Sequence, residues 1–134
     1  MPDIEELQQN TVTANVTVTT TSETVAVSSG GVKMPRPTAR VLIIAWCLMT
    51  SGAGTTSITA RVRRGTATSG TLVGEANLQS LAVAAGGNES VFKMVSEARA
   101  DEESVEYSLT VEQAAATGNG TVLEAAIAVL VLNG

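Results

Sequence analysis

The sequence predicts an all-β fold, an antiparallel sandwich of about eight strands. Thr and Val are abundant and stand side by side, which favours strands over helices. Several segments alternate apolar and polar residues with a period of two, and turn-forming residues separate them at short intervals. With one long crossover the pattern is compatible with a jelly roll, and an immunoglobulin-like sandwich is the alternative.

Four strands are expected in the first half of the chain, at residues 11–19, 24–28, 41–49 and 58–62. The first alternates strictly in TVTANVTVT, with Val and Ala on one side and Thr and Asn on the other. The last alternates in the same way and places Ile58, Ala60 and Val62 on one side. Between the second and third, a Gly pair and two prolines predict a loop or crossover over 28–38.

Four more strands are expected in the second half, at residues 78–83, 91–96, 104–112 and 125–132. The segment that begins at Val91 would also fit a short helix. The strand at 104–112 alternates clearly, with Tyr107, Leu109 and Val111 on one face. The turn TGNG precedes the final apolar segment.

The length and charge of the chain limit its organisation and its partners. Its 134 residues fit one domain, and we expect an acidic N-terminal arm over 1–10 and a single sandwich over 11–134. The arm is expected to be disordered in the free protein. No signal peptide and no run of about 20 apolar residues is present, so no membrane association is expected. The net charge of −5 and the lack of a dominant basic face argue against nucleic-acid binding.

Two predicted strands, at 41–49 and 125–132, are apolar on both faces. A sandwich strand usually shows only one apolar face, which packs on the core. The second face is therefore covered either by loops or by another molecule. Because large exposed apolar patches are rare on soluble monomers, we expect a homo-oligomer. Its interface is expected to include Leu42, Ile44, Trp46, Leu48, Ile127, Val129 and Val131.

The sequence offers little catalytic or metal-binding chemistry. It has no histidine, which removes the commonest general base and the usual zinc sites. Cys47 lies within the apolar run and is expected to be an inert, buried thiol. The acidic residues over 97–106 lack the spacing of a calcium loop and are expected to be solvated or to pair with arginines. We therefore expect no enzyme, no catalytic residue, no metal site and no cofactor.

Arg61 and Arg63 form the one basic feature that suggests an interaction. They have a structural interpretation as the outer face of the strand at 58–62. They also have a functional interpretation, in which they dock on an acidic surface of a capsid or of the next subunit.

Three segments together carry a family resemblance: TVTANVTVTTTSETVAVSS, ARVLIIAWCLMTSGAGTTSITARVRRG and the apolar C-terminal run. Over about residues 11–134 the chain resembles the small capsid decoration, or cement, proteins of tailed bacteriophages that have a trimeric jelly-roll-like body. The resemblance implies a structural virion protein, made in the host cytoplasm, that binds the capsid surface as a homotrimer. The implied partner is the major capsid protein. In that family an N-terminal segment often reaches a neighbour, which implies contacts by Ile4 and Leu7.

A second function fits the same fold. A β-sandwich of a viral fibre or appendage can bind a receptor or a carbohydrate. Exposure of Trp46 or Tyr107 on a shallow surface would favour that function, because aromatic rings are common in such sites. Burial of both residues, together with an ordered N-terminal arm, would favour the decoration function.

Overall fold

The computed structural model confirms the all-β class and describes residues 3–12, 16–18, 22–33, 40–51, 56–73, 79–83, 87–98, 104–113 and 120–133. The strands are β1 (Asp3–Val12), β2 (Val16–Val18), β3 (Thr24–Ser28), β4 (Arg40–Ser51), β5 (Thr56–Arg64), β6 (Thr71–Leu72), β7 (Gln79–Val83), β8 (Asn88–Ala98), β9 (Tyr107–Gln113) and β10 (Gly120–Asn133). The segment that begins at Val91 is therefore a strand and not the alternative short helix.

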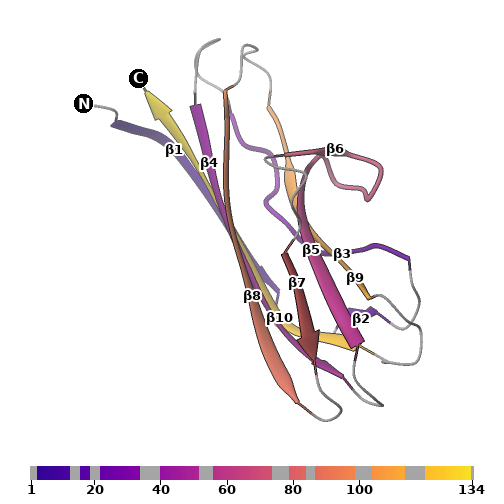
Figure 1. Ribbon diagram of the computed structural model, residues 1–134. Coiled ribbons are helices and arrows are strands. Elements are labelled where there is room, and N and C mark those ends of the chain that lie inside the picture. The colour runs from indigo at the N-terminus through magenta and orange to yellow at the C-terminus, as the bar shows by residue number, and fades with distance from the viewer. Residues whose placement is uncertain are drawn as a thin grey trace.

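The strands form two antiparallel sheets that pack face to face (Figure 1). Sheet A has the order β1-β10-β4-β8, and β2 joins β1 on the same edge of β10 because β4 occupies the other edge. Sheet B has the order β3-β9-β5-β6, and β7 shares with β6 the edge of β5 that faces away from β9. The start of β1 and the end of β10 lie at the same end of the molecule, where Asp3 pairs with Asn133.

The pairing is nested, as in a long hairpin that has been rolled up. When β1 and β2 count as one strand and β6 and β7 as another, the first strand pairs with the eighth and the second with the seventh. The third pairs with the sixth and the fourth with the fifth. Successive pairs alternate between the two sheets. This is the topology of a jelly roll, and it differs from an immunoglobulin-like sandwich, in which neighbouring strands pair early in the chain.

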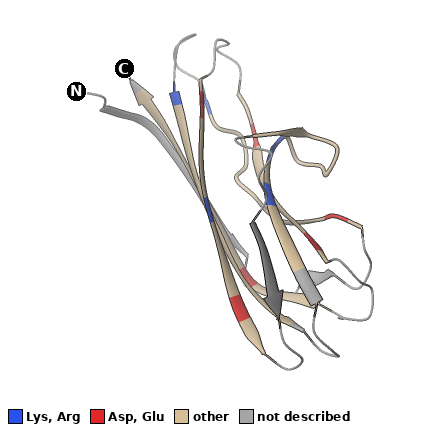
Figure 2. Ribbon diagram, in the orientation of Figure 1, with Lys and Arg blue, Asp and Glu red and all other residues tan. Residues whose placement is uncertain are grey.

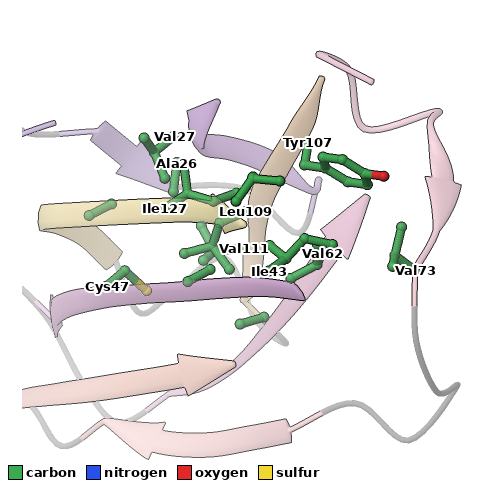
Figure 3. Close-up of a cluster of buried hydrophobic side chains, with 14 of the residues drawn as sticks. Ala26, Val27, Ile43, Cys47, Val62, Val73, Tyr107, Leu109, Val111 and Ile127 are labelled. Atoms are coloured by element: carbon green, nitrogen blue, oxygen red, sulfur yellow. The ribbon is translucent and has the colours of Figure 1, made fainter. Parts of the chain in front are cut away.

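The core lies between the sheets and is built almost entirely from aliphatic side chains (Figure 3). Ile43 and Ile127 project into it from sheet A, and Val62, Leu109 and Val111 project from sheet B. All five side chains are 1% exposed or less. Close packing of this kind supplies most of the stability of a small domain, at about 1.5–3 kcal/mol for each large apolar side chain buried.

Residues 3–12 differ from the arm that the sequence predicted. They form β1, which runs antiparallel to β10 from Asp3 opposite Asn133 to Val12 opposite Ala125. The boundary expected at residue 10 therefore falls inside a strand of the sandwich. In register, Ile4 lies opposite Leu132 and Leu7 opposite Leu130, while the side chains of Ile4 and Leu7 lie outside the described part of the chain.

Candidate assembly interface on the outer face of sheet A

The strand β4 separates its side chains into two apolar faces, as the sequence predicted. Val41, Ile43, Ala45, Cys47 and Met49 point into the core and are 1% exposed or less. Leu42, Ile44, Trp46 and Leu48 alternate with them and remain partly exposed on the outer side of sheet A. These four outer residues do not belong to the core between the sheets.

On β10 the structure corrects the expected interface. Ile127, Val129 and Val131 were expected to contact another subunit, but they are 1% exposed or less and belong to the core between the sheets. The register of β10 against β4 shifts between Val122 and Glu124, and this irregularity changes which residues of β10 point inward. The outer residues of β10 are instead Ala126, Ala128, Leu130 and Leu132.

The strand β8 adds two residues that sequence reasoning missed. Phe92 and Met94 are 54% and 61% exposed, which is unusual for side chains of their size. They lie directly opposite Trp46 and Ile44 of β4, on the same side of the sheet. The sequence contains a signal for this face. In VFKMV, Val91 and Val95 are apolar on one side of the strand, and Phe92 and Met94 are apolar on the other, as in the strands at 41–49 and 125–132.

Together these residues form a continuous surface, here called the outer face of sheet A. It comprises Leu42, Ile44, Trp46 and Leu48 of β4, Phe92 and Met94 of β8, and Ala126, Ala128, Leu130 and Leu132 of β10. Figure 2 shows few charged residues along its strands: Arg40 begins β4, Glu124 lies near the start of β10, and Glu89 and Glu97 share one side of β8 with Lys93. Lys93 of β8 alternates with Phe92 and Met94 and therefore belongs to the opposite side of the strand. Exposing such a surface forgoes apolar burial on every one of its large side chains.

The outer face of sheet B has the opposite chemistry. Glu23 receives two hydrogen bonds from Arg63, from Nε to Oε1 at 2.8 Å and from Nη2 to Oε2 at 2.9 Å. Thr110 donates a further hydrogen bond to the same carboxylate. Arg61 lies between two carboxylates, 3.2 Å from Glu112 and 3.6 Å from Glu23. These groups cover the polar side of β9, so that Thr110 is fully buried although the sequence placed it on a wet face.

This cluster determines the protonation of Glu23 and the role of the two arginines. Burial raises the pKa of Glu23, but the hydrogen bonds and positive charges of its partners outweigh burial, so the pKa lies below its ordinary value. The side chains of Arg61 and Arg63 are only 15% and 18% exposed. Their partners are carboxylates of the same chain, which supports the structural interpretation of these arginines and not their docking on a neighbour.

A second polar group joins the two sheets at the end of β8. Glu97 of β8 accepts a hydrogen bond from the hydroxyl of Tyr107 at 2.5 Å and forms an ion pair with Arg64. Tyr107 and Arg64 belong to sheet B, so the carboxylate of sheet A ties the sheets together. The expected pairing of the acidic segment with an arginine is confirmed for Glu97, while residues 101–103 lie outside the described residues. Tyr107 is fully buried.

Cys47 is buried, as the sequence predicted. Burial raises the pKa of the Cys47 thiol to about 11, which keeps it protonated and unreactive at neutral pH. Among the described residues, no three His, Cys, Asp or Glu side chains gather closely enough to hold a metal ion. Within the same residues, no helix has the length and apolar character needed to span a membrane.

Comparisons with known proteins show the fold. No protein-family model and no curated protein matches the sequence. A chain of the T13 particle of infectious bursal disease virus is similar in structure, with a TM-score of 0.60 at 8% identity, over 95% of this chain and 31% of that chain. The VP2 subviral particle of the same virus gives a TM-score of 0.56 at 11% identity, over 95% and 33% of the two chains. A chain of the disulfide-linked pili of Bacillus endospore appendages gives 0.45 at 16% identity, over 94% and 88%.

The two virus chains, with TM-scores of 0.60 and 0.56, share the β-sandwich fold of this chain. This chain spans about a third of the length of the two virus chains. At these identities a shared fold does not carry a shared function.

Proposed function

We propose that this protein is a structural virion protein that decorates and stabilises a viral capsid as a homotrimer. The observation that carries the proposal is the outer face of sheet A, a continuous apolar surface on a strand-paired and therefore rigid support. Sheets pack against one another through such faces at a separation of about 10 Å. Three copies that bring these faces together around one axis would remove Leu42, Ile44 and Trp46 from water.

The setting is a tailed-bacteriophage capsid, and the partner is its major capsid protein. The jelly-roll topology and the resemblance to decoration proteins support this setting, and the similarity to virus particle chains agrees with it in fold. The protein acts mechanically in this proposal: a trimer bridges neighbouring capsomers on the capsid surface and adds contact area between them. The chain is made in the host cytoplasm and joins the particle there.

The first test is the solution mass of the protein, measured by light scattering across a dilution series. We expect a species near three times the 13.7 kDa chain mass. Ile44→Glu places a charge in the middle of the outer face and should yield monomers. Ala67→Glu places the same charge on an exposed turn of sheet B and should leave the mass unchanged. A wild-type protein that is monomeric at every concentration would contradict the proposal.

The second test is binding to capsids assembled from the major capsid protein of the same virus without this chain. We expect the wild-type protein to cosediment with these capsids and to raise the temperature at which they release DNA or dissociate. Ile44→Glu should do neither. A stable wild-type trimer that does not cosediment would contradict capsid decoration while leaving self-association intact.

One observation favours a second candidate, a carbohydrate- or receptor-binding module. Trp46 and Phe92 lie side by side, and aromatic pairs of this kind can stack against sugar rings. The neighbours of the pair are Ile44, Leu48, Met94, Ala126 and Ser90, and among them only Ser90 offers a side-chain hydrogen bond for sugar hydroxyls. This surrounding favours a protein partner. Saturable glycan binding that Trp46→Ala abolishes would reverse the preference.

A further inference from the structure

The outer face of sheet A is uneven in side-chain size. Two neighbouring rows cross β8, β4 and β10 in register. One row is Phe92, Trp46 and Ala126, and the other is Met94, Ile44 and Ala128. Each row therefore changes from two large side chains to a single methyl group.

We call Phe92 and Met94 the β8 ridge, and Ala126 and Ala128 the β10 trough. The ridge residues are more than half exposed, and they lie on the edge strand of the described sheet. The trough lies two strands away, across β4, at about 10 Å from the ridge given the usual spacing of paired strands. A large projection and a recess of similar length thus run parallel on one surface.

We propose that the β8 ridge of one copy seats in the β10 trough of a second copy. The inference rests on the proposed function, because it assumes that the outer face of sheet A is the assembly surface. Interface cores pack as densely as protein interiors, which requires surfaces of complementary shape, and a large group that faces a small one provides such a fit. The two alanines provide that space, and neither row buries a charged group on contact.

The arrangement also fits the symmetry of a ring. In a trimer around an axis parallel to the strands, each outer face meets both neighbours, one with its β8 side and the other with its β10 side. The contact is then heterologous, and a rotation that closes gives a ring and not a filament. The ridge and trough supply the two different halves that such a contact requires.

Strand addition at the β8 edge is the competing way to join two copies. Lys93 lies on the inward side of this edge strand, and inward-pointing charges of this kind oppose pairing with another strand. If two copies of β8 paired antiparallel with Lys93 at the centre, the two Lys93 side chains would face each other. Glu89 of each copy would face Glu97 of the other, so like charges would meet at three positions. Seating of the ridge through the sheet face avoids both conflicts.

A double-mutant cycle on Met94 and Ala128 tests the inference. Ala128→Leu fills the trough, and Met94→Ala lowers the ridge. Each change alone should weaken association by about tenfold or more, measured as the dissociation constant from the dilution series. The double variant matches a low ridge to a filled trough and should recover to within a few fold of the wild-type constant. Independent effects would instead multiply to about a hundredfold loss.

Two controls keep the outcome clear. In the first control, Ala128→Leu is combined with Ser96→Ala, a change on β8 outside the ridge. The dissociation constant of this variant should stay as weak as that of Ala128→Leu alone. Urea unfolding at concentrations where the variants are monomeric should show no coupling between Met94 and Ala128, because the two side chains do not touch within one chain. Multiplied losses in a protein that still forms trimers overturn the ridge-and-trough contact and leave the proposed function standing. A monomeric wild-type protein overturns both.

Discussion

On the outer face of sheet B, the side chains that alternate with the core are polar, and they find their partners within the chain. Arg63 and Glu23 hold each other through two hydrogen bonds, and Thr110 beneath them is fully buried. Most of the corresponding side chains of sheet A are aliphatic or aromatic, and Phe92 and Met94 remain more than half exposed. Both sheets belong to one sandwich and share one core. A single chain therefore completes the outer side of sheet B, whereas the outer side of sheet A is the surface that the proposed trimer would cover.

The largest expected effect on the free energy of unfolding comes from comparing a residue on the inner side of β10 with one on its outer side. Ile127→Ala should lower the free energy of unfolding by about 2–5 kcal/mol, because it leaves a cavity in the core. Leu130→Ala on the outer face should cost about 1 kcal/mol or less in the monomer. Urea unfolding at concentrations where the protein is monomeric measures both. Equal losses would mean that the outer side of β10 is also buried within one chain.

The next effect tests whether the ion pairs of sheet B contribute to stability. Arg63→Ala leaves the carboxylate of Glu23 poorly covered, and we expect a loss of about 1–3 kcal/mol. The loss stays below that of a fully buried pair because both side chains retain some contact with water. Glu112→Gln is the matched control, since Glu112 is 35% exposed, and it should cost less than about 1 kcal/mol. Both variants should keep the solution mass of the wild-type protein, which the proposed function expects to be that of a trimer. A lower mass for either variant would remove the contrast between the two faces.

A smaller effect is expected at the contact that ties the sheets together. Tyr107→Phe keeps the ring in the core but removes the hydroxyl that donates to Glu97. We expect a loss of about 1–2 kcal/mol, as is usual for a hydrogen bond to a charged group. Thermal or urea unfolding measures the change. An unchanged stability would show that Arg64 alone satisfies the carboxylate.

The smallest expected effect is a pH dependence that comes from Glu23. Its pKa in the folded protein lies below the ordinary value of 4.5, so the folded state favours the ionised carboxylate. This contribution to stability is fully present above pH 4.5 and is lost as the pH falls through the lower, folded-state pKa. The difference in unfolding free energy between the wild type and Glu23→Gln should therefore shrink in acid. A difference that stays constant down to pH 3 would contradict the role of Glu23.

The sequence predicted most of the strands, but not β1 and not the inward side of every strand. Period-two alternation predicts β5 and β9, whereas the uninterrupted apolar run 41–49 predicts β4 and its apolar second face. The same pattern does not predict the inward side of β10. Because this strand is apolar on both sides, it has no alternation of apolar and polar residues that would distinguish its inner face from its outer face. The register shift between Val122 and Glu124 depends on pairing with β4, which is a tertiary property.

Two other features also depended on distant parts of the chain. The polar segment of β1 shows no alternation, and it becomes a strand because the long edge of β10 offers it backbone partners over nine register pairs. Thr110 is buried because Glu23 and the arginines of β5 cover it. The residues next to Thr110 in the sequence do not predict this burial, since the covering side chains come from other strands. Phe92 and Met94 lie in a segment where Lys93 interrupts the apolar run, so the segment lacks the continuous apolar pattern that marks a strand with two apolar faces.

The position of β10 has a consequence for how the chain folds. This strand lies between β1 and β4 in sheet A, yet it follows every other strand in the sequence. Sheet A therefore cannot close until β10 is available, and closing it joins segments more than a hundred residues apart, such as Val12 and Ala125. Folding that waits for such distant contacts is slow for a domain of this size. During synthesis, the apolar segment of β4 leaves the ribosome well before its central partner, and aggregation competes with folding throughout that interval.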